Sequence, residues 1–154
     1  MNLRFLFQSA ARVAGLFLVL TWTARGAVSL GIDELEKSNF ALLQGKRVGL
    51  VTNPSGIDSR GRSAISVLYN GQSAGFRLVK LFGPEHGIDG KTGAGQPVSN
   101  THDRLTGLPV YSLFITPEGN YRHPTPQMFS GLDAVVYEDV YKRQLHTTLM
   151  WRRL

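Results

Sequence analysis

Short apolar runs alternate with segments of helical periodicity through the middle of this 154-residue chain. The apolar runs have the length of β-strands, and they are continuous rather than alternating with polar residues. Continuous apolar strands are typical of parallel sheets that are buried on both faces. The pattern therefore predicts an α/β fold in which helices cover both faces of a mostly parallel sheet. The expected strands lie within residues 47–58, 76–87, 106–114 and 125–139, and the expected helices cover 31–46, 59–71 and the start of 125–139.

The ends of the expected strands carry polar groups that suit a binding or catalytic site. In an open α/β sheet, ligands bind where the carboxyl ends of the strands meet. All of these ends lie at one edge of a parallel sheet, so residues that are distant in sequence come together there. The polar residues at these ends are Asn53 and Ser55 in TNPSG, Glu85 and His86 in GPEHG, and Glu138 and Asp139 after the last strand.

Glu85 and His86 form the strongest candidate pair, because a turn that follows a buried strand can hold both side chains in place. Pro84 fixes its own φ angle, and Gly87 permits backbone angles that other residues avoid. Glu85 at a partly buried strand end could act as a general acid, and His86 could orient a substrate group or share the proton transfer. An ordinary polar turn is the alternative, because a motif of four residues has low specificity.

The other strand ends supply candidate substrate contacts. Asn53 and Ser55 present an amide, a hydroxyl and backbone N–H groups before a helix, which could bind an anion or a sugar hydroxyl. The segment lacks the lysine of a phosphate-binding loop and the GxGxxG pattern, so it does not indicate nucleotide binding. Asp139, with Glu138, could provide the second carboxylate of a glycoside-cleaving pair. The alternatives are an ordinary strand-to-helix turn and a solvated acidic strand end.

The net charge of +6 does not indicate a nucleic-acid partner, because the excess of basic residues lies at the two ends of the chain. Seven of the 17 lysines and arginines lie in residues 1–26 or 141–154, whereas all 11 acidic residues lie between these segments. The absence of cysteine excludes disulfides, a thiolate nucleophile and cysteine-bound metal. His102, Asp103 and His123 have no recognised metal-ligand spacing, so neither a metal site nor a cofactor is predicted.

Residues 1–26 have the three-part order of a secretory signal peptide. A basic start precedes an apolar run at 13–22, and the small residues Ala24 and Gly26 suit cleavage after Gly26. The apolar run is shorter than the roughly 20 residues that a spanning helix needs. We therefore expect a secreted or periplasmic protein that meets the membrane only through this segment. An uncleaved membrane anchor is the alternative.

Sequence blocks occur in a characteristic order along residues 31–137: GKRVGLVTNPSGID, LFGPEHGIDG, AGQPVSN, TGLPVYSL and PTPQMFSGLDAVVY. In these blocks the chain resembles the NamZ-type exo-β-N-acetylmuramidases, a family of secreted bacterial proteins long known only as a domain of unknown function. The resemblance implies a glycoside hydrolase that removes N-acetylmuramic acid from the non-reducing ends of peptidoglycan fragments. It also implies a Rossmann-like domain, a smaller second domain and a site in the cleft between them.

The resemblance assigns roles to individual residues. Glu85 and His86 match the glutamate and histidine of the family's PEHG motif, which are its leading catalytic candidates, and Asn53 matches another position in the cleft. Asp139 matches a family position only across a gap.

The resemblance also predicts how the chain is divided. We expect residues 27–140 to be the N-terminal part of the Rossmann-like catalytic domain. Residues 141–154 match nothing in the family, and we expect them to be an atypical tail that results from truncation or a frameshift. On this interpretation the second domain is missing, and the 154-residue chain is inactive by itself.

Two other functions remain open for the same α/β domain. A non-catalytic envelope protein could bind muropeptides without cleaving them. A metal-dependent hydrolase could cleave amide or ester bonds of the cell wall, although the scattered histidines argue against this. The fold alone does not separate these functions from a muramidase.

Overall fold

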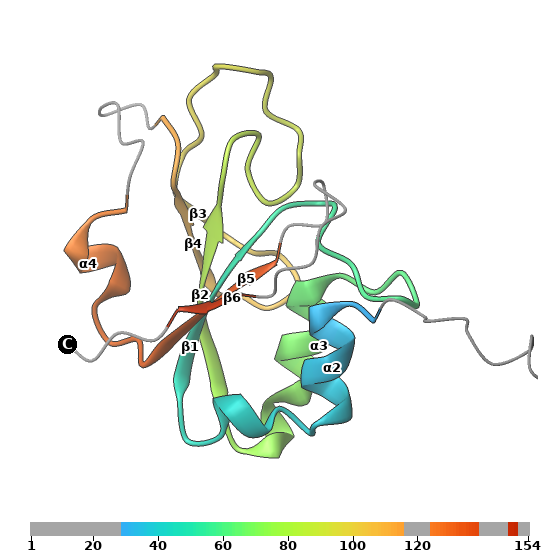
Figure 1. The fold of residues 1–154 in the computed structure, drawn as a ribbon. Helices are drawn as coiled ribbons and strands as arrows, with labels where there is room; N and C mark the ends of the chain where they lie inside the picture. Colours follow the sequence, from blue (N-terminus) through green and yellow to red (C-terminus); the bar gives the residue numbers. More distant parts are fainter. Residues whose placement is uncertain (1–28, 116–123, 139–147, 151–154) are drawn as a thin grey trace, which may run out of the picture.

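The strands of this protein form one open sheet. The structure is a computed structural model that describes residues 29–115, 124–138 and 148–150. The strands are β1 (Arg47–Thr52), β2 (Arg77–Gly83), β3 (Thr101–His102), β4 (Pro109–Ser112), β5 (Ala134–Glu138) and β6 (Thr148–Met150). Their order in the sheet is β3-β4-β2-β1-β5-β6 (Figure 1). β4, β2, β1 and β5 are parallel, whereas β3 and β6 pair antiparallel at the two edges, so the predicted mostly parallel sheet is confirmed.

Helices cover both faces of the sheet, as predicted (Figure 1). α2 (Gly31–Lys37) and α3 (Ala64–Asn70) lie together on one face. Short 3-10 helices follow each of them, η1 (Ala41–Leu43) after α2 and η2 (Gly71–Ala74) after α3. α4 (Pro126–Phe129) lies on the opposite face. The arrangement is therefore the α/β architecture that the sequence pattern predicts.

The order of the strands reverses at β1. β2 and then β4 lie on one side of β1, whereas β5, the next parallel strand along the chain, lies on its other side. Such a reversal is a topological switch point, and ligands of open α/β sheets bind in the crevice beside it. The register places Thr52 opposite Glu138 at the carboxyl ends of β1 and β5. The switch point thus lies between two polar residues.

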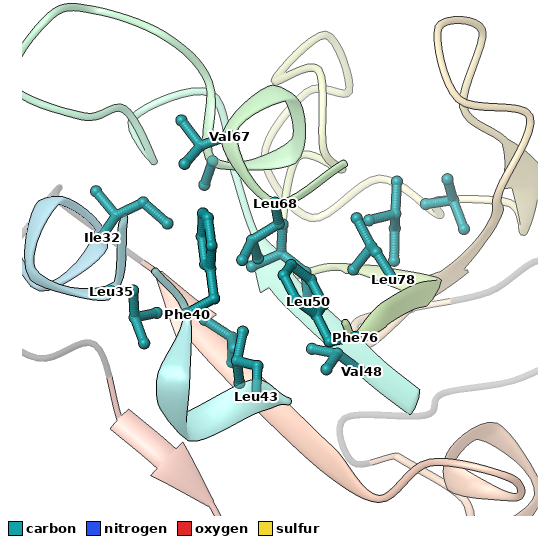
Figure 2. Close-up of a cluster of buried hydrophobic side chains, with 14 residues drawn as sticks. Ile32, Leu35, Phe40, Leu43, Val48, Leu50, Val67, Leu68, Phe76 and Leu78 are labelled. Atoms are coloured by element: carbon teal, nitrogen blue, oxygen red, sulfur yellow. The ribbon is translucent and has the colours of Figure 1, made fainter. Parts of the chain in front are cut away.

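The larger part of the core lies between the sheet and the helices α2 and α3 (Figure 2). Val48 and Leu50 of β1 and Leu81 of β2 have no exposed surface. Burial of each such side chain stabilises the fold by about 1.5–3 kcal/mol. The buried side chains that α2, η1 and α3 add to this cluster are Ile32, Leu35, Leu43, Ala64, Val67 and Leu68.

The smaller part of the core lies under α4. Phe82 of β2 is fully buried there, and its ring lies 5.3 Å from that of Phe129 and 5.8 Å from that of Tyr111 between centroids. Gly49 of β1 makes this packing possible, because a Cβ atom at that position would lie 2.7 Å from Leu132 and 2.8 Å from Phe82. The side chains that cover this face therefore pack directly on the backbone of the central strand.

The first predicted helix, 31–46, is too long. α2 ends at Lys37, and Asn39 and Phe40 adopt left-handed φ angles of 50° and 52°. Asn tolerates this conformation, whereas Phe does so only where packing compensates. The Phe40 ring is buried and lies 5.2 Å from the Phe76 ring. Tertiary packing of one aromatic side chain therefore interrupts the predicted helix.

The second predicted helix, 59–71, begins later than expected, because α3 starts at Ala64. The Ser63 side chain caps it by accepting a hydrogen bond from the backbone N–H of Ser66 at 3.2 Å. Residues 57–63 instead form a turn around Asp58, whose carboxylate accepts backbone hydrogen bonds from Arg60 and Arg62. An aspartate that binds the backbone two residues ahead favours a turn over a helix.

Two short edge strands, β3 and β6, were not predicted from the sequence. β6 lies within the segment 141–154, whose proposed origin as an atypical tail stays a prediction. The predicted signal peptide, residues 1–26, lies outside the described residues. No helix in the described ranges has the length and apolar composition needed to cross a lipid bilayer.

Candidate active site

The turn after β2 is held tightly against the end of its own strand. The chain folds back so closely at Gly83 that a Cβ atom there would lie 3.0 Å from the backbone nitrogen of Ile88. Leu113, just after β4, donates its backbone N–H to the Gly83 carbonyl at 2.8 Å. The turn therefore begins from a fixed point at the carboxyl edge of the sheet, and the β2–β3 connection extends beyond this edge (Figure 1).

Glu85 and His86 are both exposed on this turn, so the partial burial expected for Glu85 is absent. Each side chain contacts the backbone of the same connection. Oε1 of Glu85 accepts a hydrogen bond from the backbone N–H of Gly95 at 3.2 Å. Nδ1 of His86 lies 2.7 Å from the backbone carbonyl oxygen of Thr92. The two predicted catalytic side chains are thus presented to solvent while one end of each is fixed.

His86 has a φ angle of +72°, in the left-handed region. A residue with a Cβ atom costs about 1–2 kcal/mol in this conformation, which glycine adopts freely. Gly87 continues the left-handed backbone with a φ angle of +74°, and its N–H donates to the Pro84 carbonyl at 3.0 Å. Backbone strain of this kind concentrates at functional sites.

Asn53 and Ser55 lie on the turn after β1 and bind each other. Oδ1 of Asn53 accepts hydrogen bonds from the backbone N–H of Ser55 at 3.0 Å and from its hydroxyl oxygen at 2.6 Å. This is an Asx turn, the ordinary structural role of an asparagine at a strand end. The hydroxyl of Ser55 keeps acceptor capacity while it donates to Asn53. The proposed contacts of both residues with substrate stay predictions.

The turns after β1 and β2 touch each other. A Cβ atom at Gly90 would lie 2.8 Å from Cγ of Pro54, so the β2–β3 connection rests on the proline ring. Gly90 also has a left-handed φ angle of +68°. The sequence predicted that the strand ends would meet at one edge, and here the structure brings two of them into contact.

Glu138 is the acidic residue that the structure places at the switch point. It is 5% exposed at the end of β5, and Asp139, the predicted second carboxylate, lies outside the described residues. Side chains alternate between the two faces of a strand, so Glu138 shares the face of the buried Ala134 and Val136. Because Val135 and Val136 are both apolar, the sequence of this strand shows no alternation that could have selected Glu138 over its neighbour.

The loop between β1 and α3 is fixed by an ion-pair cluster around Asp58, whose side chain is 1% exposed. Nε of Arg62 lies 2.6 Å from the Asp58 carboxylate, and Nη2 of Arg62 lies 2.7 Å from Glu36 on α2. Arg60 pairs with the same two carboxylates. Burial of Asp58 acts to raise its pKa, but hydrogen bonds from Arg62 and from the backbone of Arg60 outweigh it and lower the pKa to about 2. Both arginines are thereby committed to the structure of this loop.

His102 and Asp103, which were considered as metal ligands, occupy β3 and the turn after it. Oδ2 of Asp103 accepts hydrogen bonds from the backbone N–H of Thr106 at 2.9 Å and from its hydroxyl at 2.7 Å, which makes it a turn residue. His123 lies outside the described residues. Within the ranges that the structure describes, no group of three or more acidic or histidine side chains could hold a metal ion.

The fold and the site define an open α/β protein whose candidate polar residues gather at the carboxyl edge of a parallel sheet, beside its switch point. The chain belongs to the family described as exo-β-N-acetylmuramidase NamZ, N-terminal, whose model matches residues 48–143.

Characterised and solved relatives agree with this family. The peptidoglycan β-N-acetylmuramidase NamZ of Bacillus subtilis (strain 168) is 40% identical over 111 residues, which are 72% of this chain and 25% of that protein. The crystal structure of a DUF1343 family protein from Bacteroides fragilis NCTC 9343 has 42% identity and a TM-score of 0.62, over 75% of this chain and 27% of its own. A second DUF1343 protein of the same organism, 24% identical with a TM-score of 0.52, shares the fold over 73% of this chain and 26% of its own. The chain spans about a quarter of the length of these relatives.

Proposed function

We propose that this chain supplies the catalytic residues of an exo-β-N-acetylmuramidase, which removes N-acetylmuramic acid from the non-reducing ends of peptidoglycan fragments. One observation carries the proposal: Glu85 and His86 are exposed on a backbone-held turn at the carboxyl edge of the sheet. Membership of the family and the 40% identity with the Bacillus subtilis muramidase support this reaction class.

Glu85 is the proposed general acid and base of the reaction. Its Oε1 accepts the hydrogen bond from Gly95, and among the described residues no further hydrogen bond holds its other oxygen. A carboxyl held at one oxygen can present the other to the glycosidic oxygen, protonate the leaving group and later activate water. His86, directly beside it, would bind a substrate hydroxyl or the acetamido group, or share the proton transfer.

Glu138 is the proposed second carboxylate, in the place of Asp139 or together with it. β1 separates β2 from β5. Neighbouring strands lie about 4.8 Å apart, so the ends of β2 and β5 are on the order of 10 Å apart. The carboxyl pairs of glycosidases are separated by about 5–9.5 Å. The strand ends that carry Glu85 and Glu138 are therefore separated by a distance of the same order as such a pair.

Lys91 is the proposed contact for the carboxylate that distinguishes muramic acid from other amino sugars. Its side chain is 80% exposed, and its only described ion pair is with Asp89 at 3.7 Å. It precedes Thr92, which contacts His86. Arg60 and Arg62 are engaged with Asp58 and are less able to serve this role. Asn53 and Ser55 would contact sugar hydroxyls from the neighbouring turn.

Peptidoglycan fragments as substrate are consistent with a protein that is exported. We propose that residues 1–26 act as a cleaved signal peptide and that the protein works outside the cytoplasm, in the periplasm or the medium. We also propose that catalysis needs the further length that the relatives possess, so the 154-residue chain is inactive alone.

An assay of two proteins tests the proposal. One is the 154-residue chain, and the other is a chimera in which residues 31–138 replace the matching segment of the Bacillus subtilis relative. Fragments with N-acetylmuramic acid at the non-reducing end are supplied, and free N-acetylmuramic acid is measured. We expect release by the folded chimera and none by the chain. Binding of fragments without any cleavage would favour a muropeptide-binding protein. Release of peptides or acyl groups that a chelator abolishes, without free N-acetylmuramic acid, would favour a metal-dependent amide or ester hydrolase.

A further inference from the structure

Residues 87–95 contain four glycines, at positions 87, 90, 93 and 95, and contact both proposed catalytic side chains. We propose that this segment is a positioning element, anchored by Gly90 on Pro54, which fixes His86 in the tautomer that carries its proton on Nδ1. The ring nitrogen Nε2 then faces the substrate as a hydrogen-bond and proton acceptor. The catalytic consequence rests on the proposed function, whereas the tautomer follows from the structure alone.

The tautomer follows from the chemistry of the contact between His86 and Thr92. Nδ1 of His86 lies 2.7 Å from a backbone carbonyl oxygen, which can only accept a hydrogen bond. Nδ1 must therefore carry a proton, since the other neutral tautomer would bring two acceptor lone pairs together. A neutral imidazole with its proton on Nδ1 has an unprotonated Nε2. Nε2 of His86 can thus accept a hydrogen bond from a sugar hydroxyl or from the acetamido N–H.

The same segment also orients Glu85. Its carboxylate accepts the backbone N–H of Gly95, three residues beyond the carbonyl that binds His86. Both side chains are therefore held by hydrogen bonds to the same short piece of backbone, residues 92–95, and not by a bond to each other. A shift of this backbone would move the acceptor nitrogen and the carboxylate together.

Gly90 links this piece of backbone to the turn after β1. The contact of a Gly90 Cβ with Cγ of Pro54 would be 2.8 Å, which is too short, so a side chain at this position must push the segment away from the turn. Gly93 provides a matched control within the same segment. Its Cβ would meet only Cγ of Gln96 at 3.5 Å, an ordinary contact. Its φ angle also lies outside the left-handed region.

The first test is made on the unmodified 154-residue chain and needs no activity. Long-range ¹H–¹⁵N NMR spectra, recorded at a pH where the imidazoles are neutral, report which ring nitrogen of each histidine carries the proton. We expect the proton of His86 on Nδ1, with the exposed His102 as the reference for an unconstrained ring. A proton on Nε2 of His86, or a tautomer mixture like that of His102, would overturn the proposal.

The second test compares Gly90→Ala with Gly93→Ala in the same spectra and, in the chimera, by kcat and its pH profile. Gly90→Ala should shift His86 toward a tautomer mixture and lower kcat about 10–100-fold, the range expected for a misplaced catalytic group. Gly93→Ala should leave the spectra and kcat within about twofold of the parent. The double variant Pro54→Ala/Gly90→Ala should recover part of the loss, because the proline ring no longer opposes the added methyl group.

The outcomes separate this inference from the proposed function. An Nδ1-protonated His86 in a chain whose folded chimera shows no muramidase activity would support the positioning element and contradict the function. Muramidase activity that is equally tolerant of alanine at Gly90 and at Gly93 would support the function and contradict the positioning element.

Discussion

Thr52 and Glu138 lie opposite each other at the carboxyl ends of β1 and β5, and they are 2% and 5% exposed. A carboxylate is seldom buried at a strand end without a structural or functional reason. Here the burial coincides with the point where the strand order reverses, and in open α/β sheets ligands bind at such points. This relationship connects the fold to the second carboxylate of the proposed reaction.

Replacement of Glu138 by glutamine tests that role, because it keeps the size of the side chain and removes its charge. We expect kcat of the chimera on N-acetylmuramic acid glycosides to fall by about 100-fold or more. Glu34→Gln is the matched control, since Glu34 is an exposed residue of α2 that pairs with Lys37. Activity close to that of the parent in both variants would exclude Glu138 from the chemistry.

Lys91→Gln should weaken binding of the muramic acid carboxylate without disturbing the reacting groups. We expect KM to rise about 10-fold with kcat nearly unchanged, because a hydrogen bond to a charged group contributes about 1.5–3 kcal/mol. A glycoside whose lactyl carboxylate is a methyl ester should show the same KM with both proteins. Lys46→Gln serves as the control, since Lys46 lies before β1 at the other edge of the sheet and bonds the Leu42 carbonyl. Equal effects of the two lysine variants would contradict the assignment.

Asp58 should make the stability of the chain depend on acid pH. Its pKa is lowered from 3.8 to about 2 in the folded protein, so the folded state favours the ionised form. The stabilisation is complete above pH 3.8 and is lost as the pH falls through about 2. Urea unfolding of the chain between about pH 5 and pH 2 measures this loss.

Asp58→Asn should lower the unfolding free energy at pH 7 and flatten its fall below pH 4. Asp133→Asn is the companion variant, because the Arg47 side chain and backbone N–H lower the pKa of Asp133 to about 2 as well. The contribution of Asp133 to the pH dependence of the unfolding free energy can thus be measured and subtracted. An unchanged pH dependence in Asp58→Asn would mean that the cluster around Asp58 does not stabilise the fold.

Gly49→Ala should destabilise the fold through overpacking rather than through lost contacts. The added methyl group would meet Leu132 at 2.7 Å and the fully buried Phe82 at 2.8 Å. Forced shifts of this kind cost about 1–3 kcal/mol, measurable as a lower urea midpoint. Gly93→Ala, which makes an ordinary contact, should change the midpoint little. A Gly49→Ala variant as stable as the parent would show that the α4 face is loosely packed.

The sequence predicts the strands better than the helices, for a physical reason. The strands are buried on both faces, so their apolar runs are continuous and easily recognised, as in the run that ends at Gly83. The helix ends depend on contacts between distant residues. The left-handed Phe40 breaks the first helix because its ring packs on Phe76, which is 36 positions away along the chain. β3 has only two residues, too few for a recognisable pattern.

In the candidate site, too, the sequence predicts where the sheet places the residues but not the contacts that orient them. The parallel sheet brings the turns after β1 and β2 to one edge, as the positions of Asn53 and Glu85 predicted. The contacts that orient Glu85 and His86 could not be predicted, because they are made with backbone atoms of a glycine-rich connection that has no hydrophobic pattern. The burial of Glu138 could not be predicted over an exposed position either, because the apolar run before it is continuous and does not show which face of β5 is buried.

Glu85 is the proposed acid and base in the release of N-acetylmuramic acid. The most direct measurement compares kcat of the chimera and of its Glu85→Gln variant on a chromogenic N-acetylmuramic acid glycoside. We expect kcat of the variant to be lower by about 100-fold or more, with a similar KM and an unchanged circular dichroism spectrum. A variant that releases N-acetylmuramic acid at the parent rate would exclude Glu85 from the chemistry and make the turn after β2 a structural feature.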